Sequence, residues 1–154
     1  MRFYKKFFVV LSAGFIFACA RNFVPSTPLE TLKAYTAAIK KKDTTQMKLL
    51  LSDASIKMAE QEAKAQNVPL DEIIKRETLF GENQRGVDFR NEKVDGDRAT
   101  IEMKDSFGTW VTVPFVREEG VWKIDKQSIA NQMMQDVEQR NKEFDDRINQ
   151  GRIP

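Results

Sequence analysis

Apolar and polar residues alternate along residues 87–126, and three short turn sequences interrupt this alternation. Alternation with a period of two, broken by Gly-containing turns of two or three residues, is typical of antiparallel strands joined by hairpins. The stretch therefore predicts a small antiparallel sheet. Its turns are expected at Asp95-Gly96-Asp97, Ser106-Phe107-Gly108 and Glu119-Gly120. Pro114, which has no N–H to donate, is expected at an edge or a bulge of the sheet.

Residues 27–86 carry segments in which apolar side chains recur every three or four residues, as on one face of a helix. The first segment has a complete start signal, with Thr27 as N-cap, Pro28 at the first helical position and Glu30 closing a capping box. We expect this helix to lie on the sheet. Shorter helices are predicted from residue 43 or 44, from 52 or 53 and from 70, with a break at Asn67-Val68-Pro69. The first of these is expected to carry Met47, Leu50 and Leu51.

Residues 128–149 predict one long, densely charged helix with a sparse apolar stripe that is interrupted near Arg140 and Asn141. Its first half is expected to pack on the domain. Its second half either projects into solvent, meets a partner or frays. The chain is thus predicted as an α+β domain at residues 27–127, followed by a polar helix and tail at 128–154. The stripe consists of Ile129, Met133, Val137, Phe144 and Ile148.

The N-terminus has the parts of a bacterial export signal, predicted at residues 1–18. Arg2, Lys5 and Lys6 precede an apolar run at 7–18 that is too short to span a bilayer. The sequence Ile16-Phe17-Ala18-Cys19 then resembles a lipobox, which implies acylation of the Cys19 thiol and cleavage before it. Residues 19–26 would form the lipidated Cys and a tether that holds the domain at a membrane surface.

Two alternatives use the same residues. Ala18-Cys19-Ala20 is also a small-x-small site, at which cleavage after Ala20 would release a soluble periplasmic or secreted protein. The second alternative is a signal that is not cleaved and stays in the membrane as an anchor. The lipoprotein is favoured because the single Cys of the chain stands where the lipobox requires it. Ala20 after the Cys, rather than Asp, favours the outer membrane. Both the lipoprotein and the soluble alternative predict that the domain works outside the cytoplasm.

Composition excludes several classes of activity. The 154 residues contain no His and one Cys, so an internal disulfide, a Ser/His or Cys/His nucleophile and an ordinary His-containing metal site are excluded. No cofactor or metal is predicted. Without Arg2, Lys5 and Lys6, 22 of the 25 basic residues remain against 23 acidic ones. The mature domain is therefore almost neutral, with no basic stripe for nucleic acid.

The segments TPLETLKAYTAAIKKKD (27–43) and REEGVWKID (117–125), with helices before a hairpin meander, resemble the nuclear-transport-factor-2-like (NTF2-like) superfamily, also called SnoaL-like or ketosteroid-isomerase-like. More narrowly, the chain is similar to small bacterial lipoproteins that carry an uncharacterised domain of this superfamily. The resemblance implies a cone in which a curved sheet wraps the first helix, with a pocket at the wide end. It also implies a dimer that packs sheet to sheet in many members.

We therefore expect a non-catalytic binding or assembly module. A small apolar ligand would need a cavity of roughly 300 Å³, lined by Tyr35, Met103, Phe115 and Trp122. Alternatively, Trp110 and Val116, on the other face of their strand, would form an interface for a homodimer or an envelope protein.

An isomerase-like enzyme is a further alternative, with Tyr35 as its hydrogen-bond donor. Tyr35 is the only Tyr outside the signal. The carboxylates of the meander fall at turns or on the polar face, and the Asp/His pair of dehydratase members is excluded by the lack of His.

Overall fold

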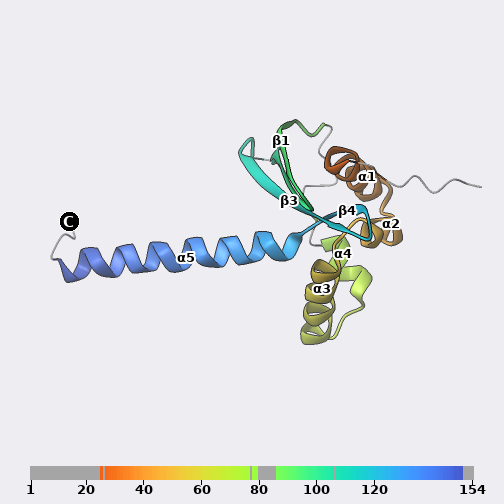
Figure 1. Cartoon of the computed structure of the whole chain (residues 1–154). Coiled ribbons are helices and arrows are strands. Elements are labelled where there is room, and N and C mark those ends of the chain that lie inside the picture. The colour runs from red at the N-terminus through yellow and green to blue at the C-terminus, as the bar shows by residue number, and fades with distance from the viewer. Residues whose placement is uncertain (1–24, 26, 77, 80–85, 106, 151–154) are drawn as a thin grey trace, which may run out of the picture.

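The computed structural model describes residues 25, 27–76, 78–79, 86–105 and 107–150. Within these ranges the chain has an α+β fold, in which four helices precede a curved four-stranded antiparallel sheet and one long helix follows it. Figure 1 shows α1 beside the sheet, α3 and α4 below it, and α5 extending far from the rest. The predicted fold class is confirmed. In the described ranges, no helix combines the length and apolarity needed to cross a membrane.

In the described part of the chain, four helices precede the sheet, and polar caps that the sequence marks begin the first three of them. The four helices are α1 (Pro28–Lys41), α2 (Thr44–Leu49), α3 (Asp53–Gln66) and α4 (Leu70–Arg76). Thr27 Oγ1 accepts a hydrogen bond from the Glu30 amide at 3.1 Å, as the predicted cap requires. Asp43 and Ser52 are the caps of α2 and α3. Asn67 ends α3 with φ 54°, so the predicted break is confirmed.

The sheet follows the predicted meander, with strands in the order β1 (Phe89–Asp95), β2 (Arg98–Lys104), β3 (Trp110–Glu118) and β4 (Val121–Ile124). Ala99, Ile101 and Met103 are buried on one face of β2, while the residues between them are at least partly exposed. Since side chains alternate across a strand, this face packs against α1, whose Leu32, Tyr35 and Ile39 belong to the same core.

Pro114 was expected at an edge or a bulge, and it lies inside β3, between β2 and β4. The last pair between β3 and β4 is Phe115 with Ile124, however, so no residue of β4 pairs with Pro114. The missing N–H of Pro114 therefore breaks no pair with β4. Its carbonyl accepts a hydrogen bond from the Asp125 amide at 2.9 Å, where the chain leaves the sheet.

The segment at residues 50–52 adds a short parallel bridge to β4. The Ser52 amide donates to Ile124 O and the Ile124 amide donates to Leu50 O, each at 2.9 Å. Leu50 and Leu51 were expected on the second helix, but α2 ends at Leu49 because this pairing takes the next residues. Ser55 Oγ then accepts from the Lys126 amide at 2.8 Å, which joins α3 to the start of the last helix.

The last helix, α5 (Lys126–Asn149), begins at Asp125, whose side chain accepts from the Ser128 amide at 3.1 Å. Only residues 126–130 are partly covered, and the residues from 131 onward are exposed. The expectation that the whole first half packs on the domain was therefore wrong. Little more than one turn does so, because α5 contacts α3 and β3 but extends away from the rest of the fold along most of its length (Figure 1).

Candidate functional site

The four side chains predicted to line a pocket come together, but as parts of the hydrophobic core. Tyr35, Met103, Phe115 and Trp122 expose 0, 1, 1 and 2% of their surface. They reach the core from α1, β2, β3 and β4. A ligand cavity between them stays a prediction, because the hollows described below are lined by other residues.

The carboxylates of the meander have structural partners. Asp105 Oδ1 accepts from the amides of Phe107 and Thr109, at 2.9 and 2.8 Å, and so holds the turn between β2 and β3. Asp125 is buried, and its second oxygen accepts from Ser128 Oγ at 2.6 Å while the first caps α5. Their geometry is that of turn and cap residues. An enzymatic use of Tyr35 is not tested by this arrangement.

Trp110 lies on the outer face of the sheet, inside a group of charged side chains. The Arg90 guanidinium carbon is 3.9 Å from the centroid of its ring, and Lys104 Nζ is 5.8 Å away. Arg90 Nε also donates to Glu102 Oε2 at 2.6 Å. This hydrogen bond is the main cause that holds the pKa of Glu102 below its ordinary value. Trp110 is thus partly covered by a cation instead of being an open apolar anchor.

Val116, the second residue of the predicted interface, shares this outer face with Trp110. It is partly buried, and the residues that pair with it across the sheet are Arg98 and Lys123. The outer face therefore combines two apolar side chains with basic neighbours. The outer face is not one continuous apolar patch, and the predicted sheet-to-sheet interface stays a prediction.

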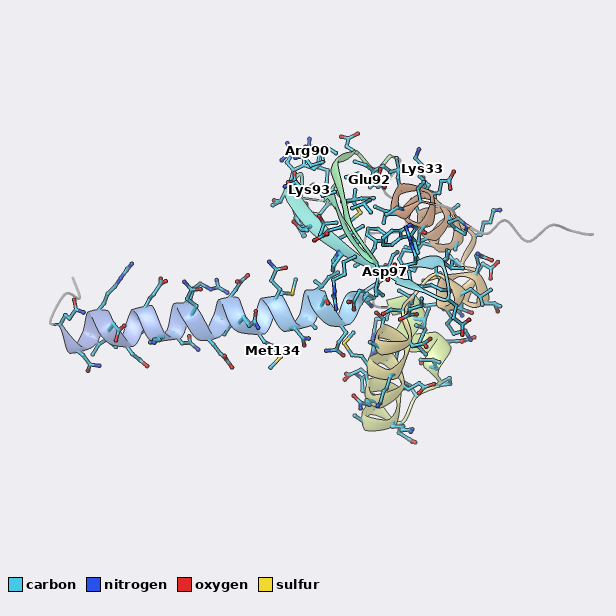
Figure 2. All side chains as sticks on the ribbon, viewed as in Figure 1. Lys33, Arg90, Glu92, Lys93, Asp97 and Met134 are labelled. Atoms are coloured by element: carbon cyan, nitrogen blue, oxygen red, sulfur yellow. The ribbon has the colours of Figure 1, made fainter. Side chains whose placement is uncertain are left out.

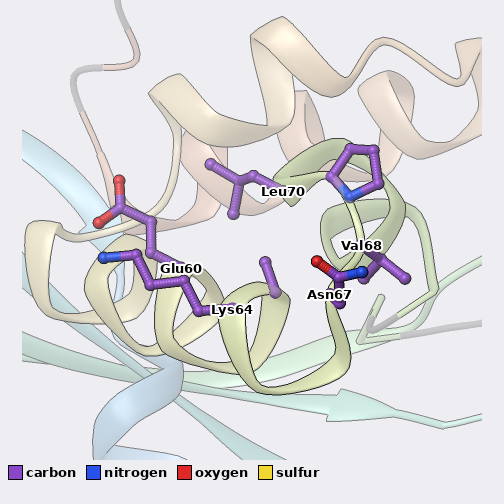
Figure 3. A pocket seen from close by; sticks show the side chains of 7 residues that line it. Glu60, Lys64, Asn67, Val68 and Leu70 are labelled. Carbon is purple, nitrogen blue, oxygen red and sulfur yellow. The ribbon is translucent and has the colours of Figure 1, made fainter.

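Sequence reasoning did not identify a hollow at the junction of α3 and α4, which Figure 3 shows from close by. Its volume is about 640 Å³, and it is wide open to solvent. The break at Asn67 creates it, because the chain turns there and α4 starts beside the last turns of α3. A smaller hollow of about 190 Å³ lies between α1 and the start of β1. The larger one is lined by Glu60, Ala63, Lys64, Asn67, Val68, Pro69 and Leu70.

Among the described residues, α5 carries more exposed large apolar side chains than any other helix or strand. Met133 and Met134 expose 63 and 64% of their surface, and Phe144 exposes 58%. Val137 and Ile148 expose 45 and 44%. Figure 2 shows Met134 pointing away from the helix, far from the folded part of the chain. The predicted stripe is present, with Met134 as a member that the sequence reasoning missed.

Among the described residues, no three His, Cys, Asp or Glu side chains gather in a way that could hold a metal ion. Three surface features of the described residues are candidates for contact with another molecule. They are the outer face of the sheet, the hollow between α3 and α4, and the exposed stripe of α5. Of the three, the stripe offers the largest unshielded apolar side chains.

No model of a protein family matches the sequence, and no curated protein is significantly similar to it. Among solved structures, the chain is similar to a protein from Campylobacter jejuni described as an NTF2-like transpeptidase. The two share 13% sequence identity with a TM-score of 0.41, and the match covers 64% of this chain and 98% of the other.

Proposed function

We propose that the chain is a lipid-anchored, non-catalytic binding or assembly module of NTF2-like type, exposed outside the cytoplasm, which acts by contact with a protein partner, either another protein of the cell envelope or a second copy of the chain. One contrast carries the choice of protein contact over ligand binding. The residues that would line a cone pocket expose at most 2% of their surface, whereas Met134 and Phe144 on α5 expose 64 and 58%. Apolar side chains in water favour contact with a partner.

The anchor is proposed from the lipobox-like sequence that ends at Cys19. Each buried methylene of an acyl chain contributes about 0.8 kcal/mol, so the several chains of a bacterial lipoprotein hold a small domain firmly. Only the short segment between Cys19 and Thr27 would separate the lipid from α1. We therefore expect the domain to stay close to the membrane surface, in the outer membrane where the cell has one.

Metabolic labelling with radioactive palmitate tests the anchor. The wild-type chain should incorporate label and sediment with membranes, and Cys19→Ser should lose the label because it lacks the thiol. Ala20→Ser is the matched control, since it alters the neighbouring residue and keeps the thiol. A wild-type chain without label, or one with an intact N-terminus, contradicts the anchor. Isomerase turnover that disappears in Tyr35→Phe would contradict the non-catalytic part.

A further inference from the structure

We propose that α5 forms a parallel, two-stranded coiled coil with α5 of a second copy of this chain. A series of residues that overlaps the apolar stripe recurs along α5 at alternating steps of four and three residues. Such spacing is the heptad repeat, in which positions a and d form the seam between two helices. The a and d residues are Ala130, Met134, Val137, Asn141, Phe144 and Ile148.

Asn141 interrupts the apolar seam at a central a position. In a helix that packs on its own domain, an exposed Asn would need no explanation. In a coiled coil, one polar residue at an a position specifies register and oligomeric state, since two Asn side chains can pair across the seam of a dimer. The interruption that makes the stripe look sparse is therefore the feature that favours two strands.

The charged residues beside the seam select the orientation. From Met134 onward, the e positions hold Glu138 and Asp145, and the g positions hold Arg140 and Arg147. In a parallel pair, a g residue faces the e residue of the next heptad on the other helix, so Arg140 meets Asp145 of the second copy. In an antiparallel pair, g faces g and e faces e. The same residues would then place arginine against arginine and carboxylate against carboxylate, which disfavours that pairing.

The geometry of α5 leaves the seam accessible. The helix has 24 residues and is therefore about 36 Å long, and every residue from 131 to 149 is exposed. Its start is fixed on the domain by the cap at Asp125 and by Ser55. A parallel pair would thus bring both domains to the same end of the coiled coil. This arrangement agrees with the proposed anchor, because both tethers would then reach one membrane.

Cysteine cross-linking in the full-length chain, expressed in cells, tests the pairing. Met134→Cys should give a disulfide-linked dimer on a non-reducing gel, because residues 134 of two parallel helices face each other. In an antiparallel pair centred on Asn141 they would lie about 21 Å apart. Gln132→Cys, at position f on the opposite face, is the matched control and should stay monomeric. The chain without a new Cys is the blank.

Charge reversal tests whether charged residues of the two copies face each other across the seam. Arg140→Glu in the Met134→Cys background places two carboxylates opposite each other and should lower the association constant roughly tenfold. Adding Asp145→Arg restores opposite charges and should restore cross-linking.

Any one of these results overturns the inference: no dimer with Met134→Cys, equal cross-linking at Gln132→Cys, or no response to charge reversal. A heavier adduct with a different protein also overturns it and assigns the stripe to that partner. Palmitate labelling is independent of all these outcomes, so the anchor and the dimer fail separately.

Discussion

Ser55→Ala tests how the base of α5 is held. Ser55 Oγ accepts from the Lys126 amide at 2.8 Å and donates to Ile124 O at 3.2 Å. A hydroxyl carries one proton, so Ser52 Oγ, 2.7 Å away, then donates to Ser55 Oγ. Alanine removes the acceptor of the Lys126 amide and the partner of the Ser52 hydroxyl together. Ser52 and Ser55 each expose 1% of their surface, so water does not replace the lost bonds without rearrangement.

The expected loss follows from the cost of unsatisfied polar groups. One buried donor without its partner costs about 1–3 kcal/mol, and Ala is slightly better than Ser inside a helix. We expect a net loss of about 2 kcal/mol in the free energy of unfolding, which is roughly a 30-fold change in the folded-to-unfolded ratio. The melting temperature should fall by roughly 5–10 °C.

Urea unfolding measures this loss, and Ala54→Ser is the matched control. Ala54 precedes Ser55 on α3 and is exposed, so the reverse exchange there should change the free energy of unfolding by less than about 0.5 kcal/mol. Ser55→Ala should also accelerate amide hydrogen exchange at Lys126 relative to the wild-type chain, whereas exchange at the far end of α5 should stay unchanged. A loss below about 0.5 kcal/mol for Ser55→Ala would refute the reasoning, as would equal losses in the two variants.

Two further predictions concern the sheet. Because the hydrogen bond from Arg90 lowers the pKa of Glu102 from its ordinary 4.5, the stability it contributes is present above that value and lost as pH falls through the lower folded pKa. Arg90→Met should raise the pKa in an NMR titration, and an unchanged value contradicts the pairing. Phe115→Ala should cost about 3–5 kcal/mol in urea unfolding, while Phe107→Ala, which removes a side chain 91% exposed, should cost almost nothing; similar costs would count against the core.

Much of the fold could be predicted because its signals are local. Ala99, Ile101 and Met103 alternate with polar residues, and a strand with that period can bury only one face. The cap at Thr27 was equally readable, since the side chain bonds a residue three positions away. The end of α2 could not be predicted in this way, because Leu50 and Leu51 pair with Ile124, which lies far along the chain. No local pattern records such a pairing.

The candidate site was harder to predict for the same reason. Alternation placed Trp110 on the outer face of β3, and the structure agrees. The cover over its ring depends on cross-strand register, since Glu102 pairs with Arg90 on one side and Lys104 with Trp110 on the other. The irregularity between Arg90 and Lys93 changes that register, and no turn residue in the sequence indicates the irregularity. How soon α5 leaves the domain also depends on tertiary contacts.

The bridge at residues 50–52 has a mechanical consequence. The strand that leads into α5 is β4, and it is hydrogen-bonded on both edges, by β3 on one side and by Leu50 and Ser52 on the other. A pull on the far end of α5 would therefore load these bonds along the strand direction, in shear, so that several must break together. With the proposed lipid anchor at one end of the chain and a partner holding α5 at the other, these bonds would resist tension on the domain.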